Sequence, residues 1–345
     1  MLQAAASSGQ MGEPCGPTTA SRYRKLDVHA ISRFIPHCIV LAFATWCAIA
    51  LRGDLAQISL APVLRSWDLV GLATVLSLSN YALRIFRWRS YLARLGHALP
   101  LRFAALTFTA GFAYTLSPGK VGELMRARYY LRLGVPLATV TAAFFTERLM
   151  DLITMIVLAA LLFAGSERYQ GAIVAAAGAV ALVLAFLRLV PWASVAAALR
   201  SRARIPAVLR APLLALTSAL AATRPLLRPA PLALGFGIGL MAWGLEGMGF
   251  GVLSSMVPGI HLDATVAVGI YSIAVLVGGL SFLPGGLGST EAVMTALLVS
   301  RGYPVPEALL ITLVCRLVTL WLAVCLGWIA VLMLRQRTLA TELPC

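Results

Sequence analysis

The chain has 345 residues, of which 60% are apolar and only 12% are charged. This small number of polar side chains cannot cover the surface of a water-soluble globule. The composition therefore excludes a soluble enzyme and predicts a protein embedded in lipid. The net charge of +15 does not indicate a nucleic-acid partner, because the 28 basic residues are spread between apolar stretches instead of gathering in one soluble segment.

The N-terminal part, residues 1–30, is polar at first and has no apolar core before Ile31. We expect a disordered cytoplasmic tail there and no cleaved signal, so the first apolar stretch stays as an anchor. Six stretches are apolar and long enough to cross roughly 30 Å of hydrocarbon. They are residues 35–51, 67–83, 136–164, 171–187, 231–257 and 304–334.

Two further apolar stretches break where a spanning helix would continue. Residues 103–117 run into Pro118-Gly119, and residues 264–283 run into Pro284-Gly285-Gly286. Such a break is tolerated at membrane depth where the chain turns back inside protein, so each stretch is expected to form a re-entrant hairpin.

Basic residues mark the cytoplasmic side. Of the Lys and Arg residues between the apolar stretches, 22 lie in the N-terminal tail, the C-terminal tail and three of the connections, and four lie in the other connections. The three basic connections are Arg84 to Arg102, Lys120 to Arg132 and Arg188 to Arg228. The positive-inside rule then places both termini in the cytoplasm, with the first hairpin entering from the inner side and the second from the outer side.

The predicted fold is therefore an all-α polytopic membrane protein of about six transmembrane helices and two re-entrant hairpins, arranged as an inverted repeat. Repeat one covers about 31–165 and repeat two about 171–335, within a membrane domain of 31–335 that is followed by a cytoplasmic tail of 336–345. Residues 191–229, with Arg every few positions, are expected to form amphipathic helices on the cytoplasmic leaflet or a solvated connector.

Residue identities support the repeat independently of hydropathy. Pro, Gly and Arg are uncommon enough in an apolar background that matches between them carry weight. The motif Pro118-Gly119-Lys120-Val121-Gly122 matches Pro284-Gly285-Gly286-Leu287-Gly288 at an offset of 166, and Gly134, Pro136 and Arg148 match Gly302, Pro304 and Arg316 at an offset of 168.

Arg148 follows Pro136 by 12 residues, and Arg316 follows Pro304 by the same number. This spacing places each arginine ~18 Å into a helix and close to the middle of the membrane. A charge at that depth costs ~2.5 kcal/mol or more, so each arginine needs a partner or a wet cavity. Arg148 has Asp151 at i+3 and Glu147 beside it. Arg316 has no acidic neighbour on its own helix, so its counter-charge comes from another helix or from a bound anion. We favour the anion, and phosphate suits the guanidinium fork.

The Pro-Gly breaks supply the second part of the expected lipid or anion site. Half-helices that end within the membrane leave unpaired N–H groups and a positive dipole end, and glycine allows the backbone to approach a ligand closely. Packing alone is the other explanation for the glycines. The residues concerned are Pro118, Gly119, Gly122, Pro284, Gly285, Gly286 and Gly288.

Two further carboxylates stand out. Glu246 lies inside an apolar stretch without a basic neighbour; it is either a partner of Arg148 or Arg316, or a carboxylate that couples transport to protons. Glu123 and Arg126 follow the first break, and solvated pairing at the head-group level is the ordinary interpretation for them. Glu291 occupies the corresponding region after the second break, but it does not align with Glu123.

No nucleophile elbow, P-loop, zinc motif or dinucleotide turn is present, and the cysteines and histidines show no pairing or ligand spacing. We therefore expect no metal, no cofactor and no enzymatic activity. An intramembrane enzyme would have only Glu147, Asp151 and Glu246 to work with.

Three segments carry a family resemblance. In order and spacing they resemble the transmembrane region of lysylphosphatidylglycerol synthases and the stand-alone flippase-like proteins built from it, over about residues 30–335. The segments are Ser117 to Glu123 with Arg126, Glu147 to Asp151, and Leu283 to Gly288 with Arg316. The resemblance implies that an anionic or modified lipid moves between leaflets, with the hairpins and the paired arginines lining its path. It does not imply lysine transfer, because the aminoacyl-transferase domain of the full synthases is not found in this chain.

The leading functional hypothesis is a flippase for an anionic phospholipid or polyprenyl-phosphate-type lipid in the bacterial inner membrane, with the phosphate bound by the two arginines. The alternative is a non-transporting membrane partner of a glycosyltransferase or an envelope-lipid enzyme. The expected partners are membrane lipids and enzymes of lipid or glycan biosynthesis, while the oligomeric state stays open.

Overall fold

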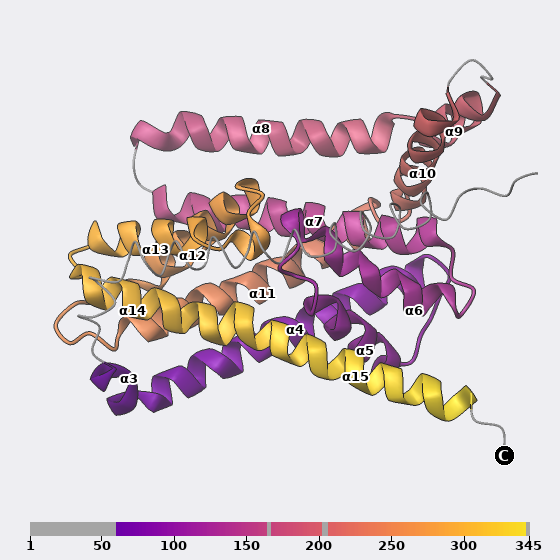
Figure 1. Ribbon diagram of the computed structural model, residues 1–345. Coiled ribbons are helices and arrows are strands. Elements are labelled where there is room, and N and C mark those ends of the chain that lie inside the picture. Colours follow the sequence, from indigo (N-terminus) through magenta and orange to yellow (C-terminus); the bar gives the residue numbers. More distant parts are fainter. Residues whose placement is uncertain (1–59, 164–166, 202–205, 343–345) are drawn as a thin grey trace, which may run out of the picture. The chain divides into compact units, whose positions relative to one another are not determined.

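The computed structural model describes residues 60–163, 167–201 and 206–342, in which helices are the only regular structure (Figure 1). The predicted tail of 1–30 and the predicted span of 35–51 lie outside these residues. The first half contains α3 (Ala61–Arg65), α4 (Trp67–Arg94), α5 (Leu101–Phe112), η1 (Pro118–Arg126), α6 (Ala127–Leu131), α7 (Leu137–Ala160), η2 (Leu161–Phe163) and α8 (Glu167–Leu189).

The second half repeats much of this order. It contains α9 (Trp192–Ser201), α10 (Ala207–Thr223), α11 (Pro229–Ser254), α12 (Ala264–Leu280), η3 (Pro284–Gly286), α13 (Ser289–Val299), α14 (Val305–Arg316), η4 (Leu317–Trp321) and α15 (Leu322–Glu342). The α14, η4 and α15 elements follow one another without a break, and the π-helical turn η4 starts directly after Arg316. Such turns inside long helices are frequent at functional sites.

The described residues include three helices that are long and apolar enough to cross a membrane, namely α4, α11 and residues 305–336, or four if the bent pair α8 and α9 is one span. The prediction of a multi-pass helical membrane protein is thereby confirmed. The number of six spans, the inverted topology and the orientation stay predictions. The α7 helix has 24 residues, about 36 Å at 1.5 Å per residue, and carries three charged side chains at its middle.

The α11 helix lies at the centre of the bundle and packs against α4, α7, α12 and α14. Glycine makes this close approach possible. A Cβ atom on Gly247 would lie 2.7 Å from the Cα of Val268 on α12, and one on Gly239 would lie 2.6 Å from Thr154 Oγ1 on α7. The neighbours of α11 include α7 and α14, so α11 links the two helices that carry Arg148 and Arg316.

The two Pro-Gly breaks lie next to each other. The α5 helix ends at Phe112 and gives way to η1, the α12 helix ends at Leu280 and gives way to η3, and η1 contacts η3. A Cβ atom on Gly285 would lie 2.8 Å from Leu116 Cδ2, just before the first break. Gly285 has φ 62°, a left-handed conformation that glycine adopts without steric cost. Motifs 166 positions apart in the sequence therefore meet in space.

Candidate functional site

One face of α4 is buried and polar although the helix crosses apolar surroundings. Its buried positions recur every three or four residues, the period of one helix face. They are Ala73, Ser77, Asn80, Tyr81, Arg84, Arg87, Trp88, Tyr91 and Leu92. The periodicity brings Arg84 and Arg87 side by side against α7. The sequence placed these two arginines in a connection after a span that ends at residue 83, and that prediction was wrong, because α4 continues to Arg94.

Glu147 and Asp151 of α7 receive these arginines. Arg87 Nη2 lies 2.5 Å from Asp151 Oδ1, and Arg84 Nη2 lies 3.4 Å from Glu147 Oε1. Trp243 of α11 also donates its indole N–H to Asp151 Oδ1 over 3.0 Å. One turn of α7 is thus tied to both α4 and α11.

The η1 segment adds a second pair of charges. Arg126 Nη2 lies 2.6 Å from Glu147 Oε2, and its guanidinium carbon stands 3.8 Å from the centre of the Trp88 ring. Glu123 accepts a hydrogen bond from the Thr115 hydroxyl over 3.1 Å. Both charged side chains are buried. The expectation of a solvated Glu123–Arg126 pair was therefore wrong, because the first break folds inward onto α7.

Together these groups form what we call the ionic cluster: Arg84, Arg87, Glu123, Arg126, Glu147, Arg148 and Asp151. Four arginines against three carboxylates leave a formal charge of 4 − 3 = +1. Burying charges is costly unless every one of them is paired. Glu246 lines a small cavity together with Arg84, so a fourth carboxylate lies beside the cluster and offsets this excess.

Arg148 is the most exposed arginine of the cluster. Its Nη2 lies 3.0 Å from Asp151 Oδ2 and 3.2 Å from Glu147 Oε1, as predicted from their spacing on α7. However, neither Nε nor Nη2 has a hydrogen-bond partner of good geometry, although both atoms are buried. About a fifth of its side-chain surface, 21%, is nevertheless exposed. Arg148 is therefore held mainly by ion pairs, and part of its side chain is exposed.

Arg316 is held more firmly. Its Nε donates to Glu291 Oε1 of α13 over 2.6 Å, and its Nη2 donates to the carbonyl of Gly285 over 2.7 Å. The counter-charge thus comes from another helix, which corrects the favoured interpretation that a bound anion supplies it. Glu291 was named as lying near the second break, but its pairing with Arg316 was missed.

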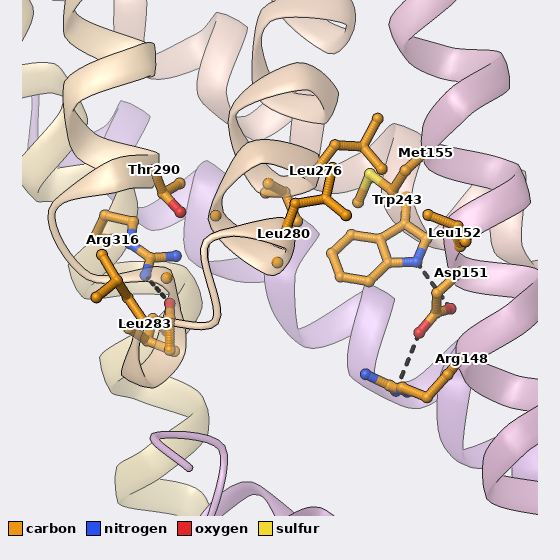
Figure 2. A pocket seen from close by; sticks show the side chains of 16 residues that line it. Arg148, Asp151, Leu152, Met155, Trp243, Leu276, Leu280, Leu283, Thr290 and Arg316 are labelled. Carbon is orange, nitrogen blue, oxygen red and sulfur yellow. Dashed lines mark hydrogen bonds and ion pairs between the residues drawn. The ribbon is translucent and has the colours of Figure 1, made fainter. Parts of the chain in front are cut away.

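Arg148 and Arg316 line one cavity of about 250 Å³ between α7, α11, α12, the second break and α14 (Figure 2). In Figure 2 the two guanidinium groups stand at opposite ends of the row of labelled side chains, with Trp243 and Leu280 between them. The other lining residues include Asp151, Gly285, Gly286 and Thr290. We call this space the arginine cavity.

A smaller cavity of about 50 Å³ adjoins the same region and is lined by Arg84, Glu123, Glu246 and Arg316. Tyr271 of α12 donates to Glu246 Oε2 over 2.5 Å. Glu246 thus lies close to both Arg84 and Arg316 without lining the arginine cavity. Its role as a partner or as a coupling carboxylate stays open.

The remaining predicted residues stabilise the breaks. Pro118 and Gly119 begin η1, and Pro284 begins η3. Gly122 donates its N–H to Ser117 Oγ over 2.6 Å, and Gly288 donates its N–H to Glu291 Oε2 over 2.6 Å. At these two glycines the protein itself occupies the N–H groups that we expected to meet an anion.

Sequence reasoning found Arg148, Arg316 and the carboxylates of α7, but it missed Arg84, Arg87 and Trp243. The i, i+3 spacing of Arg84 and Arg87, continued by Tyr91, was the signal that could have extended the helix. No group of three or more His, Cys, Asp or Glu residues in the described ranges is placed to hold a metal ion.

Comparison with known proteins gives the family. The family model for the lysylphosphatidylglycerol synthase TM region matches residues 35–327. The chain is also 29% identical over 311 residues to a UPF0104 membrane protein of Methanothermobacter thermautotrophicus, an alignment that covers 84% of this chain and 88% of that protein. The resemblance noted in the sequence is confirmed over most of its length: this chain belongs to the family of the lysylphosphatidylglycerol synthase transmembrane region.

Proposed function

We propose that this protein moves a lipid with a phosphate-bearing head group from one membrane leaflet to the other. The observation that carries the proposal is the arginine cavity, in which two guanidinium groups from different halves of the chain face one space. Arginine binds phosphate through two parallel hydrogen bonds, and Arg148 is the most exposed arginine of the ionic cluster, with 21% of its side-chain surface accessible.

The size of the cavity agrees with a head group and not with a whole lipid. Its 250 Å³ lies just below the range of about 300–1,000 Å³ for small-molecule pockets. The two guanidinium groups that line the cavity favour an anionic head group. The candidate cargo is therefore an anionic phospholipid or a polyprenyl-phosphate-type lipid.

The proposed arrangement is an inverted repeat of six spans and two re-entrant hairpins, with both termini in the cytoplasm and the protein in the inner membrane. Transporters of this construction bind their cargo where the repeats meet and expose it alternately to the two sides. The contact between η1 and η3 supports the proposal, because it places the matched motifs of both halves side by side, and the second motif lines the arginine cavity.

We further propose that the carboxylates of α7 are not catalytic. Glu147 is fully buried between Arg84 and Arg126, and Asp151 accepts hydrogen bonds from Arg87 and Trp243. Such bonds hold the arginines in place and leave these carboxylates no freedom to exchange protons with a substrate. Partner enzymes of lipid or glycan biosynthesis would supply or consume the cargo.

Reconstitution tests the proposal. Proteoliposomes containing fluorescent phosphatidylglycerol, with fluorescent phosphatidylcholine in a parallel set, would report leaflet exchange through quenching of the outer leaflet. We expect faster exchange of the anionic lipid than in protein-free vesicles, a loss of that gain in Arg148→Gln, and no change in Arg301→Gln, which alters an exposed arginine in a loop. Folded protein that accelerates neither lipid, while co-purifying with a biosynthetic enzyme, would favour the scaffold instead.

A further inference from the structure

A second, larger opening lies beside the arginine cavity, between α7 and α8. Its volume is about 650 Å³, and every residue that lines it is apolar. We call it the apolar slot. Its lining includes Ile156 and Val157 of α7, Ala177 and Ala181 of α8, and Leu276 of α12.

The slot exists because α8 is attached to the bundle mainly at one end. Leu187, near the C-terminal end of α8, packs into a cluster with Leu149, Met150 and Ile153 of α7. It is the one buried residue of α8 among those whose exposure is described. Further from that end, alanines face the gap from both helices and are too short to fill it.

An opening of this size does not stay empty. Protein interiors are close-packed, and side chains that line a void lose their dispersion contacts. Water is excluded as the occupant, because the lining offers no polar partners for it. In a membrane the solvent of matching polarity is hydrocarbon, and 650 Å³ lies within the range of about 300–1,000 Å³ for ligand pockets.

The slot and the arginine cavity share a wall. Leu276 of α12 lines both of them. On α7, Leu152 and Met155 line the arginine cavity, and the next two residues, Ile156 and Val157, line the slot. Figure 2 shows Leu276 and Met155 close together beside Trp243. A molecule with a phosphate at Arg148 could therefore extend past Leu276 into the slot.

We propose that the apolar slot binds an acyl chain of the lipid whose head group occupies the arginine cavity. The inference rests on the proposed function for the identity of the head group, and it adds a site for the tail. The occupant is one hydrocarbon chain, which the apolar lining accepts and the neighbouring arginines select through its phosphate.

Photolabelling tests the slot directly. Full-length protein would be placed in phosphatidylcholine nanodiscs that contain a trace of phosphatidylglycerol with a diazirine on its acyl chain, irradiated, and mapped by mass spectrometry. We expect slot residues to be labelled more strongly than the outward-facing residues of α8. Ala177→Phe fills the slot and should lower that labelling about fivefold, which corresponds to about 1 kcal/mol of binding free energy.

The matched control is Ala179→Phe, which makes the same change two residues further along α8 at a position that does not line the slot. It should leave the labelling unchanged. Ala181→Phe offers a second change inside the slot if Ala177→Phe does not fold. Replacing Arg148 with Gln should lower slot labelling and spare the outer face of α8, because only the selected lipid is lost.

Equal labelling on both faces of α8, or equal effects of both phenylalanine variants, would overturn the inference. The proposed function fails separately. Slot labelling without any leaflet exchange would retain the binding site and refute transport, whereas exchange that is indifferent to Ala177→Phe would retain transport and refute the slot.

Discussion

Arg316 donates from Nε to Glu291 Oε1 over 2.6 Å, and the other oxygen of the same carboxylate accepts the N–H of Gly288 over 2.6 Å. Arg316 also donates to the Gly285 carbonyl. One carboxylate and one guanidinium thus hold both ends of the second Pro-Gly break. Arg316 therefore has a structural role as well as its place in the arginine cavity, and the two roles can be separated by mutation.

Glu291→Gln should destabilise the protein by about 3–5 kcal/mol, because it leaves the largely buried Arg316 without its counter-charge. The double variant Glu291→Gln with Arg316→Gln should lose less than the sum of the two single changes. Thermal unfolding in detergent measures both. Additive losses would show that the two side chains do not stabilise one another.

Arg87→Gln should be more destabilising than Arg148→Gln. Arg87 is fully buried and pairs with Asp151, so its removal leaves a buried carboxylate short of a partner, at a cost of about 3–5 kcal/mol. Arg148 is partly exposed and makes ion pairs without good hydrogen bonds. Its loss should weaken lipid binding while the fold persists. Arg94→Gln, at an exposed position on the same helix as Arg87, serves as the control for unfolding temperature.

Gly285→Ala tests the contact between the two breaks. The new Cβ atom would meet Leu116 at 2.8 Å in a residue with φ 62°. Gly134 has φ 76° with nothing within 4 Å of a Cβ atom, so Gly134→Ala isolates the backbone cost of about 1–2 kcal/mol. We expect Gly285→Ala to lower the unfolding temperature further, and Leu116→Ala to restore part of the difference. Equal effects at both glycines would mean that the breaks do not press on each other.

Much of this site could be predicted from the sequence, because residues that are rare in an apolar background recur at matched positions in its two halves. Pro118, Arg148, Pro284 and Arg316 stood out against an apolar background, and spacing alone placed Asp151 beside Arg148. What hydropathy could not show was burial of charge. A window that averages over Arg84 ends the span there, whereas the ion pairs with α7 let α4 continue for ten more residues, to Arg94.

Partners across helices were also beyond the sequence. Glu291 lies 25 positions from Arg316 and Trp243 lies 92 positions from Asp151, and no local pattern links either pair. The expectation of free N–H groups at the breaks was wrong at Gly122 and Gly288 for a related reason. The side chains of Ser117 and Glu291 lie a few residues away in the chain, so they accept these N–H groups without the need for a bound ligand.

Trp243→Phe separates support of the ionic cluster from binding. The change removes the indole N–H that donates to Asp151 Oδ1 and keeps an aromatic ring in the arginine cavity. A hydrogen bond to a charged group contributes about 1.5–3 kcal/mol, so we expect a loss of stability of that order. Asp151 keeps its bond to Arg87 over 2.5 Å, so the cluster should stay assembled and phosphatidylglycerol exchange should persist. Trp328→Phe, at a ring that is 50% exposed, is the matched control for both measurements. Full stability with abolished exchange would instead assign the indole N–H to the bound head group.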